Sequence, residues 1–203
     1  AEMNKADLKL DWCSHEAAKY ACEKWHYSGC IPKSKSVYLG VWESGKFIGV
    51  LIFGLGASSH LGAPYGLKTF EAAELTRIAL TQHESAVSRI GSIAMRMVKK
   101  QSPGLRLLVS YADPAQDHHG GVYQAMGWIY NGKTNPDWAV IDAKGKQWHS
   151  RICSTTGIKS QFGKKKKAMR PQDGTKVILP GKHRYLMPLD DEMRKRIEPL
   201  RKP

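Results

Sequence analysis

The sequence has little of what marks a small metal-bound, secreted or membrane protein. Its four cysteines include no Cys-x-x-Cys pair, which argues against a zinc ribbon and against a thioredoxin-like motif. It has no secretory signal pattern, so we expect reduced thiols and a cytoplasmic location. No apolar run is long enough to cross a bilayer, and we therefore expect no membrane partner.

Acidic residues are scarce as well. The chain has 18 Asp and Glu against 32 Lys and Arg, which gives a formal net charge of +14 and a pI near 9.7. This surplus favours a polyanionic partner, most simply nucleic acid, although a soluble basic protein would show the same balance. With 203 residues and no internal repeat, the chain is long enough for one well-buried domain with an appendage.

What is present is organised around residues 105–132. Leu105–Tyr111 is a short apolar run that predicts a buried strand, and Val122–Met126 predicts a short helix after a polar loop. Asp113 therefore lies at the carboxyl end of a buried strand, with Tyr123 a few residues away. Because open α/β folds bind ligands at the carboxyl ends of their strands, we expect the chemistry of the protein here.

The remaining segments are read from periodicity and turn signals. Ser14 and Asp190 are expected helix N-caps, Gly127 is expected to end a short helix in the left-handed conformation, and Ser44-Gly45 is the expected turn of a hairpin. Before the organising stretch, the pattern predicts a strand, a helix, a hairpin, a strand and a second helix, at residues 8–12, 15–25, 37–55, 71–80 and 89–100. After it come a hairpin, a basic run, two strands and a helix, at 138–152, 164–167, 177–179, 183–187 and 192–197. We predict an α/β (α+β) fold in which a mixed sheet is flanked by helices over residues 1–131. A basic β-rich extension, 132–203, is expected to pack on this core.

The order of these elements resembles that of GNAT-type acyltransferases, and four motifs narrow the resemblance. They are Tyr111-Ala112-Asp113-Pro114, Gly121-Val122-Tyr123-Gln124, Glu74-Leu75-Thr76-Arg77 and Lys182-His183-Arg184-Tyr185. Together they resemble the Mom family of phage proteins, which convert adenine in DNA to N6-carbamoylmethyladenine and protect phage DNA from restriction. The resemblance covers roughly residues 25–196. It implies a GNAT-like catalytic core over 1–131 and assigns the extension to nucleic-acid contacts.

The resemblance also implies which residues act. Its catalytic positions fall on the strand–helix unit (Asp113 and Tyr123), the Leu-Thr-Arg strand (Arg77), the start of the central helix (Ser88) and the aromatic pair after the first helix (His26 and Tyr27). A carboxylate hydrogen-bonded to the adenine amine suits Asp113 as general base. Tyr123 would donate to a leaving group or an oxyanion, and Arg77 would bind a carbonyl or phosphate.

Each of these residues also has a structural interpretation. An Asp before Pro is often a turn residue, a Tyr on a short helix is often part of the core, and an Arg in an apolar strand is often part of an ion pair. His118 and His119 beside Asp113 invite a metal site, with His26 or His60 as further ligands. Adjacent loop histidines are more often solvated and the ligand spacing is not fixed, so we predict no metal.

The cofactor-binding residues expected from the resemblance are Ser88, Gly91 and Ser92. GNAT enzymes hold the CoA pyrophosphate with a Gln/Arg-x-x-Gly-x-Gly/Ala loop at a helix N-terminus. The matching residues here are Ser88-x-x-Gly91-x-Ile93, in which only the glycine is retained. The expected donor is therefore glycyl-tRNA or acetyl-CoA, with glycyl-tRNA narrowly preferred because the family product carries a terminal amide.

The expected macromolecular partner is double-stranded DNA with a flipped adenine, together with tRNA if tRNA carries the donor. The residues expected to contact nucleic acid are Lys33, Lys35, Lys164, Lys165, Lys166, Lys167, Lys182, His183 and Arg184. A four-lysine run is usually solvated, but on a chain of +14 it is expected to follow phosphates.

The function that combines these expectations is adenine modification in the cytoplasm of a phage-infected or lysogenic bacterial host. Two alternatives stay open. One is an ordinary GNAT N-acetyltransferase of a protein or small amine, and the other is a non-catalytic basic DNA-binding protein. Analysis of the nucleosides in DNA exposed to the protein separates the first function from both alternatives.

Overall fold

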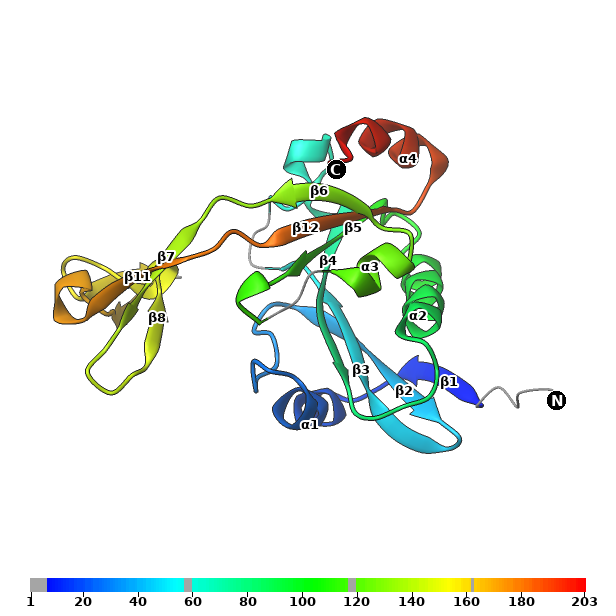
Figure 1. Cartoon of the computed structure of the whole chain (residues 1–203), viewed down its shortest axis with the longest axis horizontal. Coiled ribbons are helices and arrows are strands. Elements are labelled where there is room, and N and C mark those ends of the chain that lie inside the picture. The colour runs from blue at the N-terminus through cyan, green and yellow to red at the C-terminus, as the bar shows by residue number, and fades with distance from the viewer. Residues whose placement is uncertain (1–6, 57–59, 117–119, 162) are drawn as a thin grey trace. The chain divides into compact units, whose positions relative to one another are not determined.

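Apolar strands pair into a mixed seven-stranded sheet (Figure 1). The computed structural model describes residues 7–56, 60–116, 120–161 and 163–203. The sheet order is β1-β2-β3-β4-β5-β12-β6. The strands are β1 (Leu8–Trp12), β2 (Ser36–Glu43), β3 (Lys46–Gly54), β4 (Ala72–Leu80), β5 (Leu107–Ala112), β6 (Ile129–Lys133) and β12 (His183–Pro188). β4 and β5 pair in parallel, whereas β5 pairs with β12 in an antiparallel ladder.

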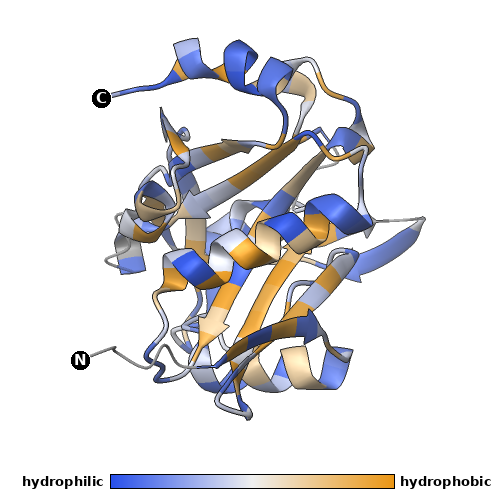
Figure 2. Cartoon of the chain, turned by 90° about the vertical axis from the view of Figure 1, so that its right-hand side faces the viewer, coloured by the Kyte–Doolittle hydropathy of each residue, from blue (hydrophilic) through white to orange (hydrophobic). Residues whose placement is uncertain are grey.

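Within the described residues, four α-helices cover the two faces of this sheet: α1 (His15–Trp25), α2 (Val87–Gln101), α3 (Gly121–Ala125) and α4 (Asp191–Ile197). One large apolar cluster joins α2 and α3 to one face of the sheet. Figure 2 shows α2 lying across apolar strands. On the opposite face, separate clusters join α4 to β5 and β12, and α1 to β3 and β4.

The chain divides into two compact units. Among the described residues, the first comprises 7–112, 120–132 and 183–203, and the second comprises 113–116, 133–161 and 163–182. The second unit has a three-stranded sheet, ordered β11-β7-β8, and a two-stranded β9-β10 hairpin. Its strands are β7 (Asp137–Ile141), β8 (Gln147–His149), β9 (Ile158–Gln161), β10 (Lys164–Lys167) and β11 (Thr175–Leu179). Its small core includes Ala139, Val140, Cys153 and Ala168.

Several local predictions are confirmed. Ser14 caps α1 by accepting the N–H of Ala17, and Asp190 caps α4 by accepting the N–H of Met193. Gly127 has φ +78°, the left-handed conformation expected after a short helix. Short-range capping and turn signals therefore placed these helix ends correctly.

The extent of the extension differs from the prediction. From His183 the chain returns to the first unit, because β12 lies between β5 and β6. Tyr185, Leu186 and Met187 are all buried there, as expected of a central strand covered on both faces. The four-lysine run also takes regular structure: it is the exposed strand β10, paired with β9.

Candidate active site

β4 and β5 pair over only three residues and then part. Ala72–Glu74 pairs with Leu107–Val109, and no further pairing of β4 with β5 follows among the described residues. On its other side, β4 carries a bulge, because Ile52 and Phe53 of β3 pair with Arg77 and Leu75 and leave Thr76 between them. A bulge bends its strand and increases the local twist, so it directs β4 away from β5.

A polar relay occupies the place where the two strands part. Ser110 Oγ donates to the carbonyl oxygen of Leu75 at 2.8 Å and lies 2.7 Å from the hydroxyl oxygen of Tyr123. Serine has one hydroxyl hydrogen, and a carbonyl can only accept. When Ser110 donates to Leu75, the hydrogen between the two hydroxyls therefore comes from Tyr123. This relay ties α3 and β5 to the free edge of β4.

Burial keeps Tyr123 in its protonated form. It is the main cause that raises the pKa of Tyr123 to about 12; the Glu74 carboxylate contributes to the rise, and the hydrogen bond with Ser110 opposes it. The Tyr123 ring stacks on Tyr185, with ring centroids 5.1 Å apart and planes at 25°. Tyr123 is therefore both a core residue and a poised hydrogen donor, so the two interpretations of it do not exclude each other.

The His26–Tyr27 pair follows α1 directly. The N–H of Ser28 donates to Nδ1 of His26 at 3.1 Å, so the neutral imidazole carries its hydrogen on Nε2. The two rings are 4.3 Å apart, and Tyr27 is 53% exposed. An exposed aromatic ring suits stacking on a base. Because Tyr27 acts electrostatically on Tyr123, the structure brings these two predicted residues together.

Arg77 lies on β4 just beyond the bulge. Its Nη1 donates to the carbonyl of Thr76 at 2.7 Å, while its buried Nε has no hydrogen-bond partner among the described residues. Burial raises the pKa of Cys22 in α1, and the positive charge of Arg77 opposes that rise. Arg77 therefore faces α1. In the part of the chain that the structure describes, it forms no ion pair that would explain it structurally. Unfilled buried donors of this kind suit a ligand oxygen or nitrogen.

Asp113 follows β5 directly and belongs to the second unit. Its Oδ2 lies 3.3 Å from Nζ of Lys182, and its side chain is 19% exposed. Its carbonyl accepts the N–H of Gln116, which makes the turn that an Asp-Pro pair predicts. The turn and the ion pair leave a catalytic role for Asp113 as a proposal. His118 and His119 lie outside the described residues.

The predicted cofactor residues lie near the N-terminus of α2. Ser88 is half-buried in the first turn, and Ser92 Oγ donates to its carbonyl at 2.8 Å. A Cβ at Gly91 would overlap the sulfur of Met126, so this glycine allows the end of α3 to approach α2. Gly91 thus has a packing reason of its own. Ala86, at the N-cap, supplies no side-chain cap to the first N–H groups of the helix, which remain suited to an anion.

The predicted nucleic-acid contacts fall into two groups. Lys33, Lys35, Lys182 and the β10 lysines are exposed. His183 and Arg184, by contrast, are half-buried in β12. Nδ1 of His183 hydrogen-bonds the Tyr130 hydroxyl at 2.9 Å, and Nε of Arg184 is buried without a hydrogen-bond partner in the described part of the chain. Only the exposed lysines have the freedom that backbone contact needs.

The sequence analysis does not single out Ser110, and it uses Glu74 and Tyr185 only as parts of motifs. The sequence does contain an indication for Ser110, because a single hydroxyl within a buried apolar run needs a hydrogen-bond partner. Glu74 had a weaker one, a carboxylate within an apolar strand. Tyr185 had none, because its contact with Tyr123 depends on β12 lying beside β5.

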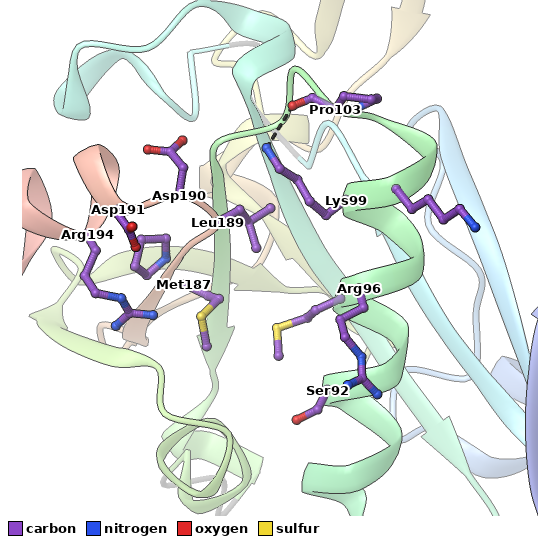
Figure 3. Close-up of a pocket in the computed structure, with 12 residues that line it drawn as sticks. Ser92, Arg96, Lys99, Pro103, Met187, Leu189, Asp190, Asp191 and Arg194 are labelled. Carbon is purple, nitrogen blue, oxygen red and sulfur yellow. Dashed lines mark hydrogen bonds between the residues drawn. The ribbon is translucent and has the colours of Figure 1, made fainter.

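A separate groove of about 780 Å³ lies between α2 and the segment from β12 to α4 (Figure 3). Met95 and Met187 line it, and Arg96 and Arg194 flank it from opposite sides. One wall includes Asp190, whose carboxylate accepts two hydrogen bonds from Arg106 at 2.8 and 3.0 Å. The lining contains no residue of the Tyr123 relay.

The described residues contain no group of three or more His, Cys, Asp or Glu side chains arranged to hold a metal ion. No helix in the same residues is long and apolar enough to cross a membrane.

The sequence model of the Mom protein family matches residues 7–203. This chain belongs to the Mom family. Among characterised relatives, it is 24% identical to the methylcarbamoylase mom of Escherichia phage Mu over 196 residues, which are 94% of this chain and 79% of that protein. The family membership predicted from four short motifs is confirmed.

Solved structures place this Mom protein among the GNAT acetyltransferases in fold. Aminoglycoside acetyltransferase AAC(6')-Ib, solved with coenzyme A and kanamycin, gives a TM-score of 0.51 at 9% identity and covers 95% of this chain and 99% of its own. FeeM, an N-acyl amino acid synthase from uncultured soil microbes, gives 0.50 at 11% identity, with 97% and 96% covered. The predicted GNAT-like fold is confirmed.

Proposed function

We propose that this protein modifies the N6 amine of adenine in DNA, converting it to N6-carbamoylmethyladenine and so protecting phage DNA from restriction. The observation that carries the proposal is the Tyr123–Ser110–Leu75 relay between parted strands in a chain of the Mom family. The exposed ring of Tyr27, electrostatically coupled to Tyr123, supports a base-sized acceptor beside the relay. The +14 charge favours a polyanionic substrate.

The chemistry needs a base for the amine and an acid for the leaving group. The lone pair of the adenine amine is delocalised into the ring, so removal of a proton as the new bond forms makes the amine a better nucleophile. Asp113 is the proposed base. Tyr123, with a pKa near 12, stays protonated at neutral pH and is the proposed donor to the departing oxygen or sulfur. Arg77 offers the unfilled Nε–H of its guanidinium to the carbonyl that is attacked.

A glycyl donor accounts for every atom of this product. Attack of N6 on a glycyl ester forms the N6–C bond, breaks the ester C–O bond and leaves a free glycyl amine. That amine attacks C6 to close a five-membered ring. The ring opens by breaking the bond between C6 and the original N6, which becomes the terminal amide nitrogen. The result is adenine carrying NH–CH₂–CO–NH₂ at C6. Acetyl transfer gives neither the methylene–nitrogen bond nor the terminal amide.

The exposed lysines supply the electrostatic part of the proposal. Each of Lys164–Lys167 is exposed on β10, and regularly spaced ammonium groups suit a phosphate backbone. The target amine is paired within a duplex, so the adenine has to leave the stack before it reacts. We assign backbone contact to the lysines of the second unit and base binding to the first.

The experiment supplies purified protein and DNA with one labelled donor at a time, either isotope-labelled glycine on tRNA or labelled acetyl-CoA. Mass analysis of the nucleosides then follows the label. We expect label in carbamoylmethyladenine from glycyl-tRNA and none in the matched reaction with the Tyr123→Phe variant. Label that enters adenine only from acetyl-CoA overturns the glycyl donor. If no modified adenine forms with either donor, DNA adenine is not the substrate. An amine acetyltransferase or a DNA-binding protein then becomes the better interpretation.

A further inference from the structure

Three side chains of adjacent strands share the α4 face of the sheet. Glu74 of β4 pairs in register with Val109 of β5, and Arg184 of β12 pairs with Tyr111 of β5. Val109 and Tyr111 both pack in the cluster on the α4 side. Since paired residues point to the same face of a sheet, Glu74 and Arg184 lie on either side of Tyr111 on that face.

The strand spacing and the register together set the distance between Glu74 and Arg184. β4 and β12 are two strand widths apart, about 10 Å at about 4.8 Å per strand. Arg184 is level with Tyr111, two residues beyond the Val109 partner of Glu74, which adds about 7 Å along β5, so the two backbone positions are about 12 Å apart. Glutamate and arginine side chains directed toward one another would close most of this distance and leave a gap comparable to the edge of a nucleobase. The Tyr111 ring lies between them as an aromatic surface.

Electrostatics supports this grouping. Burial is the main cause that raises the pKa of Tyr111 to about 12; Glu74 contributes to the rise, while Arg184 opposes it. Burial also raises the pKa of Tyr65, and Arg184 opposes that rise too. The four side chains therefore interact as one cluster. The carboxylate of Glu74 lies against Gly56, where a Cβ would overlap it, so the backbone at Gly56 confines the acid.

Arg184 has unused hydrogen-bonding capacity in this cluster. Its Nε is buried, and among the described residues it hydrogen-bonds no acceptor and forms no ion pair. A buried guanidinium donor without a partner is destabilising, so this Nε–H suits an acceptor that the described chain does not supply. Glu74, two strands away, has a carboxylate that accepts hydrogen bonds, whereas the Arg184 guanidinium donates them.

We propose that Glu74 and Arg184 read the edge of the target adenine, with Glu74 accepting from the N6 amine and Arg184 donating to the neighbouring ring nitrogen, N1 or N7. This inference rests on the proposed function and names how its site selects the base. Adenine places a donor beside an acceptor on both edges, matching an acid–arginine pair. Hypoxanthine carries a carbonyl oxygen in place of the amine, so Glu74 would repel it.

The test measures binding, and it needs no acyl donor. Single strands of thymidine with one central purine are titrated with the protein, the purine being adenine, hypoxanthine, 1-deazaadenine or 7-deazaadenine. Wild-type protein is expected to bind the adenine strand about tenfold more tightly than the hypoxanthine strand. The strands carry equal charge, so the ratio of their affinities cancels the contribution of the backbone.

The two variants act on different atoms. Glu74→Gln is nearly isosteric, and its amide can donate to the hypoxanthine oxygen, so the preference for adenine is expected to fall to about onefold. Arg184→Met is expected to weaken adenine binding about tenfold. It should also remove the effect of whichever deaza substitution weakens the wild type. The exposed Glu84 supplies the matched control, Glu84→Gln, which should keep the wild-type ratio.

Each outcome bears on the pair. Equal binding of adenine and hypoxanthine by the wild type overturns the inference, and so does an unchanged ratio in Glu74→Gln. A deaza effect that persists undiminished in Arg184→Met overturns the role of Arg184. Since the strands themselves vary, the wild-type comparison is decisive even if a variant misfolds. Failure to modify adenine with either donor is a different result and counts against the proposed function.

Discussion

Replacing Ser110 by alanine removes the centre of the relay. Its hydroxyl serves two buried groups, the Leu75 carbonyl and the Tyr123 hydroxyl. A buried polar group left unpaired costs about 1–3 kcal/mol, and relaxation recovers part of the sum. We therefore expect the free energy of unfolding to fall by about 2–3 kcal/mol. For a chain of this size each kcal/mol shifts Tm by about 2–4 °C, which gives a fall of about 4–12 °C.

The assay is urea unfolding, which reports the midpoint and the m-value together. Ser92→Ala is the matched control, because its hydroxyl bonds only the carbonyl of Ser88 within the same helix. That change is expected to cost less than about 0.5 kcal/mol. In the double variant Ser110→Ala with Tyr123→Phe, part of the loss should return, since one unpaired hydroxyl is gone. A Ser110→Ala variant as stable as Ser92→Ala would refute the relay.

Four further predictions follow from the site. Asp113→Asn and Tyr123→Phe should each lower the modification rate at least about 100-fold while leaving the fold intact, because each keeps the shape of the side chain and alters its proton chemistry. Alanine at Lys164–Lys167 should make the dependence of log Kd on log salt shallower, by about 0.9 per lost phosphate contact. Gly91→Ala should destabilise by about 1–3 kcal/mol through overlap with Met126. Because the pKa of Tyr123 is raised in the folded state, the unfolded state loses that proton first, and stability should fall as pH rises from about 10 to 12.

Each of these predictions has its own control. Near-normal modification by a folded Asp113→Asn variant would exclude the carboxylate as base. Lys46, exposed in the β2–β3 hairpin, should not change the salt slope when it is replaced. Pairing Gly91→Ala with Met126→Ala should recover part of the lost stability, which no role in phosphate binding explains. In Tyr123→Phe the loss of stability above pH 10 should be smaller than in the wild type.

Features of short sequence range were predictable. The apolar run before Asp113 gave β5, Ser14 and Asp190 marked two helix starts, and Ser44-Gly45 marked the β2–β3 turn. Each of these signals acts over a few residues, where steric and hydrogen-bonding preferences decide the outcome. The family resemblance added the positions of Tyr27 and Tyr123, which the structure brings into one electrostatic cluster.

Features that depend on strand order were not predictable. The place of β12 between β5 and β6 depends on pairing across about 70 residues, and no local pattern encodes that choice. Glu74 and Arg184 share a face only because of this order. The bulge at Thr76 was not predictable from the sequence either, because it is defined by the pairing register of β4 with β3.

The position of β12 has a consequence for synthesis on the ribosome. β5 is complete at residue 112, but its antiparallel neighbour begins only at residue 183. A nascent chain therefore carries β5 with one edge unpaired while some 70 further residues are made, and open edges invite pairing with other chains. The second unit, built of short hairpins, can fold within that interval. Tyr185, whose ring stacks on Tyr123, is also synthesised late. A chain that stops before β12 therefore lacks a formed site as well as a complete sheet.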